Sequence, residues 1–251
     1  ILTNSNNMKK MRLFNVKFIL AIYFQLIMGI AFAQKPGGTT LEVELWLKSD
    51  EIMSANNASV TSWQDKSGKG RDHTRYSNHG VPTLDKVNMM NFHPSLHFEN
   101  GAANTKLVYP NHFVNGGRSY YTFYVSRLNS ADNSYGVVYT FNEGRQNENG
   151  WRYGNPWMRT DDHLVATNTP PLMGGMVSTF RTNTTTSVDQ LFFNGGWLAS
   201  MSNARAMNAG SGSSVIGNEN LATTYPFYGH IQEIIVLSTS AGLPLNTTEI
   251  E

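Results

Sequence analysis

The stretch that decides the expected fold covers residues 227–237 and reads Phe227-Tyr228-Gly229-His230-Ile231-Gln232-Glu233-Ile234-Ile235-Val236-Leu237. It opens with aromatic residues and a glycine, alternates briefly, and ends in an uninterrupted apolar run. Such a run is typical of a strand that is buried on both faces, so we expect it in the middle of a sheet.

Glu233 is the one carboxylate inside this run, and it shares strand parity with Ile231 and Ile235. It should therefore point toward the core unless a bulge intervenes. We interpret Glu233 as a structural carboxylate that accepts hydrogen bonds from loop or backbone donors. The alternative is a buried acid with a raised pKa that takes part in chemistry.

Other stretches alternate between polar and apolar residues as half-buried strands do. Residues 41–47 place four aliphatic side chains on one face: Leu41, Val43, Leu45 and Leu47. Residues 120–127 form the clearest strand of the middle region, and residues 135–141 should be its antiparallel neighbour. Asn194-Gly195 lies between two apolar runs and predicts a hairpin. About a dozen short strands without a long amphipathic helix predict an all-β fold.

The first 33 residues have the layout of a secretory signal peptide. Met8 starts a basic segment, residues 18–32 are apolar, and a small-x-small site predicts cleavage after Ala33. The alternative is a membrane anchor, but about 15 apolar residues fall short of the roughly 20 that span a bilayer. We expect a spacer at residues 34–40 and one domain at 41–251, in a protein that is secreted or on the outer cell surface.

Charge and cysteine content exclude several classes. The 251 residues carry 19 basic and 18 acidic side chains, and four of the basic ones lie in residues 1–33, so removing this leader changes the net charge from +1 to −3. No basic patch remains to bind nucleic acid. The chain has no cysteine, which excludes disulfides and cysteine-ligated zinc.

Four motifs, taken in order, resemble the laminin-G-like branch of the concanavalin A-like lectin/glucanase superfamily, as found in secreted Bacteroidetes surface proteins. These motifs are Leu45-Trp46-Leu47-Lys48, Trp63-Gln64-Asp65-Lys66-Ser67-Gly68, Leu96-His97-Phe98-Glu99-Asn100-Gly101 and the 227–237 stretch. The resemblance implies a two-sheet antiparallel β-sandwich, a concanavalin A-like jelly roll, with the closing strand near the first strand. It also implies further domains downstream. The capping-box pattern that begins at Asn246 agrees, because it predicts a helix cut off at the chain end.

No catalytic residues are predicted. Glycosidases of this fold need spaced carboxylates on one strand, and the nearest match, Glu42 and Glu44, is interpreted as an exposed polar face. His93 and His97 lie too far apart on a strand to share a metal ion. Calcium is a possible cofactor, with Asp65 or Asp72 as oxygen ligands, but its site is not placed.

Aromatic side chains in loop-rich segments are the remaining candidates for a binding site, because flat rings stack on sugars. They are Trp151, Tyr153, Trp157, Tyr225 and Tyr228. The alternative is that these rings pack the ends of the sandwich. We expect a non-catalytic binding or adhesion module for an extracellular glycan or surface protein. A glycoside hydrolase of the same superfamily and a structural spacer in a large adhesin are the alternatives.

Overall fold

The computed structural model describes residues 35–77, 79–99, 105–113, 118–129, 135–142, 146–152, 155–160, 163–166, 174–181, 188–202, 212–221 and 225–239. Within these ranges the chain forms a three-residue 3₁₀ helix, Pro36–Gly38, and sixteen strands. All the strands belong to one compact unit, Thr39–Glu251. The predicted signal peptide and the predicted helix start at Asn246 lie outside the described residues. No described helix has the length and hydrophobicity needed to cross a bilayer.

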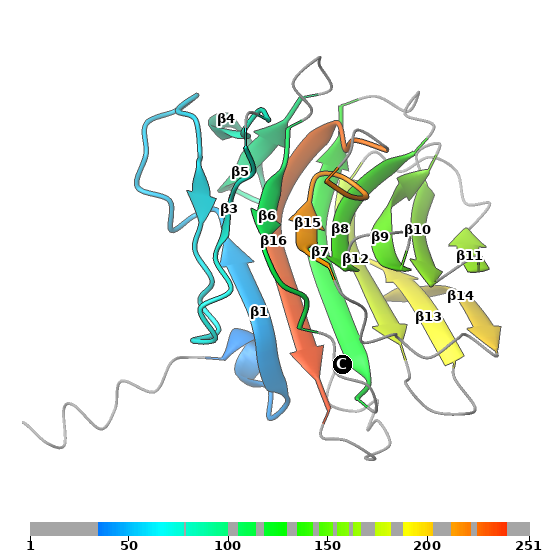
Figure 1. Ribbon diagram of the computed structural model, residues 1–251. Coiled ribbons are helices and arrows are strands. Elements are labelled where there is room, and N and C mark those ends of the chain that lie inside the picture. The colour runs from blue at the N-terminus through cyan, green and yellow to red at the C-terminus, as the bar shows by residue number, and fades with distance from the viewer. Residues whose placement is uncertain are drawn as a thin grey trace, which may run out of the picture. The chain divides into compact units, whose positions relative to one another are not determined.

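The first sheet runs in the order β14-β13-β12-β7-β16-β5-β4, and β1 also pairs with β16 (Figure 1). In chain order its strands are β1 (Glu42–Lys48), β4 (Thr83–Met90), β5 (His93–Phe98), β7 (Tyr120–Leu128), β12 (Gly174–Arg181), β13 (Val188–Phe193), β14 (Gly196–Ser202) and β16 (Gly229–Ser238).

The second sheet runs in the order β11-β10-β9-β8-β15-β6-β3-β2. In chain order its strands are β2 (Ser62–Trp63), β3 (His73–Arg75), β6 (Leu107–Tyr109), β8 (Gly136–Asn142), β9 (Gln146–Arg152), β10 (Asn155–Thr160), β11 (His163–Ala166) and β15 (Ser214–Ile216). All strand pairs in both sheets are antiparallel. The predicted two-sheet antiparallel β-sandwich is confirmed.

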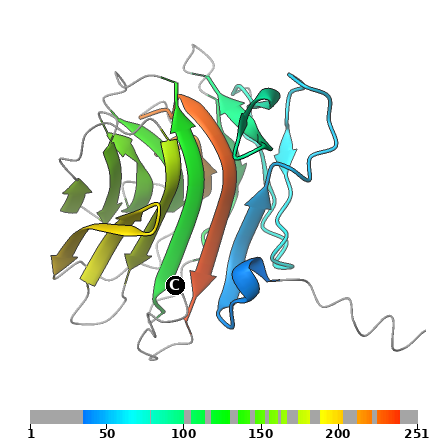
Figure 2. The same ribbon diagram turned by 180° about the vertical axis from the view of Figure 1, so that it is seen from behind.

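The stretch that decided the expected fold forms β16, in the interior of the first sheet. One edge of β16 pairs along its length with β7; the other edge pairs first with β5 and then with β1 (Figure 2). Ser49 lies at the junction of these two partners, where its hydroxyl lies within hydrogen-bonding distance of the carbonyl oxygens of Pro94 (2.6 Å) and Gln232 (2.8 Å). The expected position of the closing strand, beside the first strand, is confirmed.

Bulges reverse the predicted faces of β1 and β16. The pairing register shifts between Val43 and Leu45, so Leu45 enters the main core while Val43 joins a smaller cluster with Tyr121 and Leu237. The predicted single face for the four aliphatic residues of β1 is therefore wrong. A bulge has this effect because one extra residue inverts the alternation of side chains.

Two further strand predictions need correction. Residues 135–141 do not pair with residues 120–127, because β8 lies in the second sheet while β7 pairs with β12 and β16. The chain crosses from the first sheet to the second after β7, and hydrophobic periodicity within a strand does not predict such a crossing. The segments that contain Trp151 and Trp157, expected to be loop-rich, form β9 and β10.

The main core lies between the two sheets, and buried side chains from both contribute to it. The largest of these are fully or almost fully buried: Trp63, Phe98, Tyr120, Tyr124, Tyr139, Phe141, Trp151 and Phe227. On β7 the inward residues alternate from Tyr120 to Leu128, and the smaller cluster around Tyr121 lies on the opposite face of the same strand. Apolar burial of this extent is the main stabilising contribution in a chain without disulfides.

Candidate functional site

Trp151 does not form part of an exposed aromatic surface. Its side chain is fully buried, its indole N–H donates to the Ser126 hydroxyl in the opposite sheet (2.7 Å), and its ring lies edge-to-face against Phe193. The predicted ligand-binding role is contradicted for Trp151, because a ring with no exposed face cannot stack on a sugar. The structure instead uses it to join the two sheets.

Trp157 and Tyr225 are brought together, through a residue that the sequence did not single out. The ring of Tyr135 lies 4.8 Å from Tyr225 and 5.8 Å from Trp157, and the guanidinium of Arg152 lies 4.5 Å from the Tyr135 ring centre. The Trp157 side chain is only 1% exposed, so its predicted stacking role is also wrong. Tyr135 and Tyr225 are half-buried and keep part of their surface open.

Tyr228 has a different ring neighbour. Tyr228 lies against His97 of the first sheet, with ring centres 6.3 Å apart. Tyr153 falls outside the described residues. The four described positions of the predicted set therefore do not form one binding surface.

Glu233 faces away from the main core, because the register of β16 shifts between Ile231 and Glu233. Its carboxylate accepts a hydrogen bond from the indole N–H of Trp46 (2.7 Å) on the neighbouring strand β1. The donor is thus a side chain rather than the loop or backbone group that the sequence suggested. The side chains on either side of the bulge, Ile231 and Ile234, are both fully buried.

The pair Glu42 and Glu44 is not an exposed polar face. Glu44 is buried, and its carboxylate contacts Arg71 (2.7 Å), Arg118 (3.0 Å) and the Ser238 hydroxyl (2.6 Å). Glu42 contacts the same Arg118 (2.6 Å) and Lys69. Hydrogen bonds from these two cations lower the pKa of Glu42. Glu42 therefore lacks the raised pKa of a catalytic acid, and both carboxylates act in structural ion pairs.

The carboxylates proposed for calcium also hold local structure. Asp65 accepts hydrogen bonds from the backbone N–H groups of Trp46, Ser67 and Arg71. Asp72 accepts one from the backbone N–H of Asp65 (2.8 Å). Within the described ranges, no three His, Asp or Glu side chains come together as a metal ion would require.

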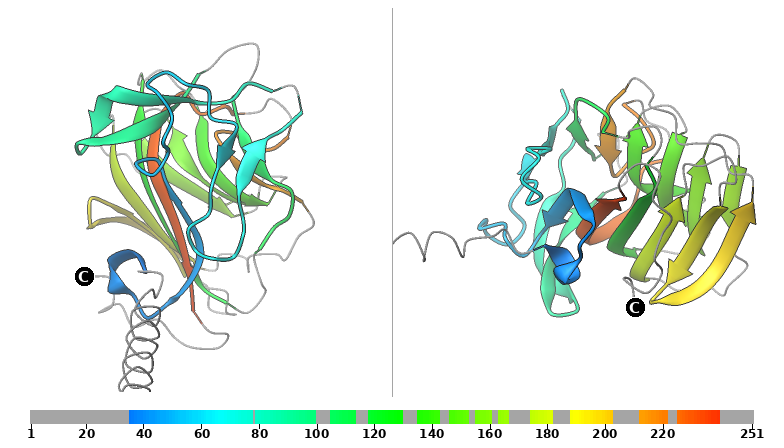
Figure 3. Two further views of the ribbon diagram at one scale, coloured as in Figure 1. Left: turned by 90° about the vertical axis from the view of Figure 1, so that its left-hand side faces the viewer. Right: turned by 90° about the horizontal axis from the view of Figure 1, so that it is seen from below.

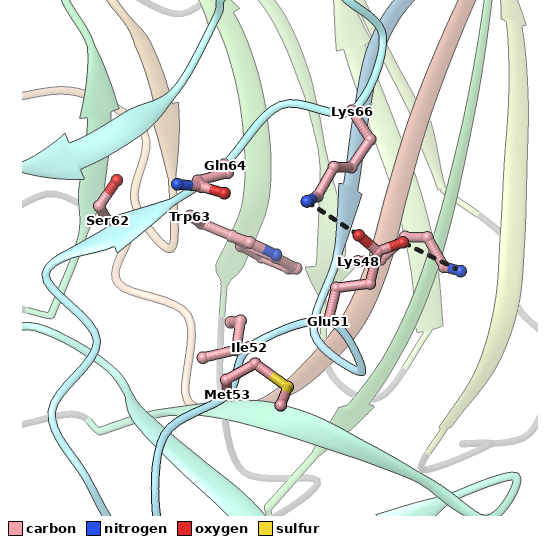
Figure 4. Close-up of a pocket in the computed structure, with 8 residues that line it drawn as sticks. All are labelled: Lys48, Glu51, Ile52, Met53, Ser62, Trp63, Gln64 and Lys66. Carbon is pink, nitrogen blue, oxygen red and sulfur yellow. Dashed lines mark ion pairs between the residues drawn. The ribbon is translucent and has the colours of Figure 1, made fainter. Parts of the chain in front are cut away.

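These Asp65 bonds position a pocket at the end of β1. Asp65 forms a bridge with Leu47, and the Lys66 N–H donates to the Trp46 carbonyl (2.7 Å), so the segment after β2 runs beside β1. The pocket holds about 290 Å³, near the lower end of the range for small-molecule sites. Its wall is formed by eight residues (Figure 4): Lys48, Glu51, Ile52, Met53, Ser62, Trp63, Gln64 and Lys66.

The pocket combines charged, polar and apolar groups. Glu51 lies between Lys66 (2.8 Å) and Lys48 (3.6 Å), and the hydrogen bond from Lys66 is the main cause of its lowered pKa. Figure 4 shows the indole of Trp63 directed toward the Lys66–Glu51 ion pair. Ile52 and Met53 form the apolar side. A ligand with both hydroxyl groups and carbon faces matches this combination.

Trp63 is the distinctive group of this pocket. Its side chain is fully buried, and its indole N–H has no hydrogen-bond partner within the described part of the chain. A buried donor without an acceptor costs about 1–3 kcal/mol, so a ligand oxygen that reached it would recover that energy. The sequence did not predict this pocket, because its wall comes from two separate segments, residues 48–53 and 62–66.

No family model and no curated protein matches this sequence. Among solved structures, domain 4 of AbnA, an extracellular GH43 arabinanase from Geobacillus stearothermophilus solved with arabinotriose, is similar over 84% of this chain and 97% of that chain (11% identity, TM-score 0.56). The receptor binding domain of botulinum neurotoxin D is similar over 83% of this chain and 51% of that chain (13% identity, TM-score 0.54).

The binding domain of Paraclostridial Mosquitocidal Protein 1 is also similar, over 84% of this chain and 51% of that chain (13% identity, TM-score 0.52). This chain thus spans about half the length of the two toxin domains and nearly all of the arabinanase domain. At such low identity the likeness shows a shared β-sandwich fold.

Proposed function

We propose that this chain is a non-catalytic binding module for glycans and that the pocket beside Trp63 is its ligand site. The observation that carries the proposal is a pocket that presents Gln64, Lys66 and Glu51 beside the unpartnered indole N–H of Trp63. Because Trp63 is fully buried, a ligand reaches this N–H only after the partly exposed Lys66 and Glu51 side chains move aside. Sugars offer many hydroxyl oxygens and an apolar ring face, and both kinds of surface find a counterpart there.

Two of the structural neighbours support this proposal. The arabinanase domain was solved with a bound trisaccharide, and the neurotoxin D domain is a receptor binding domain. The predicted signal peptide supports an exported protein that meets glycans outside the cell. In this proposal the module belongs to a longer cell-surface chain with further domains downstream.

A matched pair of tryptophan substitutions tests the site. Trp63→Phe removes the N–H group and keeps most of the ring volume, and we expect it to weaken glycan binding about tenfold, the value of one hydrogen bond. Trp157→Phe is the control, because the indole N–H of Trp157 is also buried without a hydrogen-bond partner in the described residues but lies outside the pocket.

The measurement is a glycan array with and without calcium, followed by calorimetric titration starting with arabinotriose. Binding that is lost in Trp63→Phe and kept in Trp157→Phe would support the proposed site. Equal losses in both variants would mean that the loss comes from damage to the fold, and would contradict the proposed site. A native chain that binds no glycan would contradict the proposal and favour the structural spacer.

The alternative of a glycoside hydrolase has one pair of carboxylates to consider. Glu148 and Glu219 both approach the same guanidinium nitrogen of Arg159, at 3.8 and 3.9 Å. Both are almost completely buried, so a substrate cannot reach them in this structure. Release of reducing sugar from any array ligand, lost in Glu148→Gln, would favour the enzyme over the binding module.

A further inference from the structure

The hairpin of β4 and β5 exposes apolar side chains at its tip. Phe92 is 93% exposed, Val87 72% and Met89 47%. Six large hydrophobic side chains are exposed in the described part of the chain, and these three lie within six residues of one another. Clustered exposure of this kind marks an interaction site more often than single exposed residues do.

An unusual bulge presents Val87 and Met89. The β4–β5 register passes from Asp85↔Ser95 directly to Met90↔His93, so four residues of β4 lie opposite a single residue of β5. The carboxylate of Asp85 holds this bulge, accepting the backbone N–H groups of Val87 (2.9 Å) and Asn88 (2.8 Å) and the Asn88 amide (3.0 Å). Burial would raise the pKa of Asp85, but these hydrogen bonds lower it overall. The bulge is therefore stabilised by its own set of hydrogen bonds.

The turn at the tip is strained for its sequence. Asn91 and Phe92 have φ values of 48° and 65°, in the left-handed region where a bulky residue is unfavourable and glycine is preferred. The Phe92 side chain gains no burial in return, because it is almost fully exposed. A strained and exposed aromatic residue does not stabilise this fold, so its contribution must come from contact with something outside it.

Charge and shape around the tip favour a lipid surface as that contact. Residues 86–93 contain Lys86 and no acidic residue. Arg127 donates to the Asn88 carbonyl (3.4 Å), which brings a second cation to the bulge. Two acidic groups contact this region: Asp85, buried under the bulge, and Asp50, 3.6 Å from His93. β5 and β4 form one end of the first sheet, and their hairpin projects from the body of the sandwich (Figure 3). A narrow, protruding tip can enter a headgroup layer more readily than it can cover a flat protein surface.

We propose that the tip of this hairpin, residues 86–93, inserts into the interface of a lipid bilayer, with Phe92, Val87 and Met89 among the acyl chains and Lys86 and Arg127 at anionic headgroups. This combination of apolar and basic groups is what interfacial membrane anchors use. The inference goes beyond glycan binding and does not depend on it, because the hairpin tip and the Trp63 pocket share no residues.

Labelled vesicle binding tests the insertion. The chain has no cysteine, so Phe92→Cys carries a single environment-sensitive fluorophore at the tip. With phosphatidylcholine vesicles containing about one-third phosphatidylglycerol, we expect a blue shift of the emission and flotation of the protein with the lipid. The matched control is Trp197→Cys, an exposed position (60%) on the β13–β14 hairpin, whose label should not shift.

A second variant separates binding from folding. Phe92→Gly suits the positive φ, so the protein should remain folded with an unchanged or higher Tm while vesicle affinity falls at least tenfold. Trp197→Gly should leave vesicle affinity unchanged. The proposal is overturned if the native protein binds neither neutral nor anionic vesicles, or if Phe92→Gly binds as the native protein does. A tip that binds a soluble protein but no vesicle would also overturn it.

Discussion

The β4–β5 and β13–β14 hairpins stand at opposite ends of the strand order of one sheet, and both reverse the chain through two residues with positive φ. The first residue of each turn is asparagine, Asn91 in one and Asn194 in the other. The second residue is Phe92 in one and Gly195 in the other. Both turns therefore adopt the same backbone conformation. The β13–β14 turn uses glycine, which favours a positive φ, and the β4–β5 turn uses phenylalanine, which disfavours it.

The two turns also differ in what surrounds them. Asn194 is hydrogen-bonded to β12, the strand beside β13 in the sheet. Its N–H donates to the Met176 carbonyl (2.8 Å), and its side chain accepts from the Met176 N–H (3.0 Å). The β4–β5 hairpin is instead shaped from within, by the Asp85 bulge, and ends in an exposed ring. The turn that stabilises its sheet has the residue that its backbone conformation favours. The turn that presents a side chain to the outside has a residue that its conformation disfavours.

The largest expected effect concerns the bulge. Asp85→Ala removes the acceptor for two backbone N–H groups and should lower the free energy of unfolding by about 3 kcal/mol. Urea unfolding gives this value, and hydrogen exchange should show faster opening of β4–β5 than of β13–β14. Asp85→Asn keeps a side-chain acceptor and should lose less than half as much; equal losses in the two variants would contradict this account.

The next effect depends on pH and on His230, which lies behind the same hairpin, 3.2 Å from the Ser95 hydroxyl and 3.7 Å from Asp85. Burial, with repulsion from His97 and Arg127, lowers the pKa of His230 to about 4. The unfolded chain therefore binds the proton more readily between pH 6.5 and pH 4, so stability should fall by about 2 kcal/mol as the pH drops through this window.

Urea midpoints near neutral pH and at about pH 4.5 measure this loss, and His230→Gln should remove the part due to His230. His73, whose pKa burial also lowers to about 4, remains as a second acid-sensitive group in the other sheet. The β13–β14 hairpin contains no histidine and should not open selectively in acid. A variant with the full acid loss of the native protein would show that His230 is not the cause.

A third prediction gives the β13–β14 turn the sequence of the other turn. Gly195 has φ 79°, is exposed, and would accept a Cβ with no atom within 4 Å, so we expect the ring of Gly195→Phe to point into solvent. The variant should lose about 1–2 kcal/mol through backbone strain. The neighbouring Gly196 lacks a positive φ, and Gly196→Ala is the control with a loss near zero. Thermal unfolding of both variants is the measurement, and similar Tm values for the two would disprove the strain.

The smallest effect is the reverse exchange. Phe92→Gly creates Asn-Gly in the β4–β5 turn and should raise the free energy of unfolding by about 1 kcal/mol, because the strain is relieved and little burial is lost. Phe92→Asn should give a smaller gain, since asparagine tolerates positive φ better than phenylalanine does. A loss of stability in Phe92→Gly would mean that the ring packs against the sheet in solution.

Sequence patterns predicted the strands with regular hydrophobic periodicity and the turn with a favourable Asn-Gly pair. The apolar run in β16, the alternation in β7 and the Asn194-Gly195 turn all appeared as expected. The β4–β5 hairpin was missed because its turn lacks glycine and its bulge interrupts the alternation. β9 was missed because it carries polar residues inward and outward alike, including the buried Glu148 and Asn149.

For the candidate sites too, local sequence patterns did not predict which residues are buried and which come together. Trp151 and Trp157 were predicted to be accessible because Gly- and Asn-rich sequence surrounds them, yet both are buried in strands. The pocket beside Trp63 joins the end of β1 to the segment after β2, through the bridge between Leu47 and Asp65. No local signal reports that contact, because it depends on how two segments pack.

By itself, the sequence determined that this chain is an all-β sandwich, that β16 lies inside a sheet and that no cysteine supports the fold, because hydrophobic periodicity and composition act along the chain. Only the tertiary structure decided which faces are buried, because the bulges in β1 and β16 invert the alternation that the sequence displays. It also decided where Trp63 and Phe92 lie. One has a buried N–H without an acceptor and the other an exposed ring in a strained turn, and both conditions arise from packing rather than from sequence spacing.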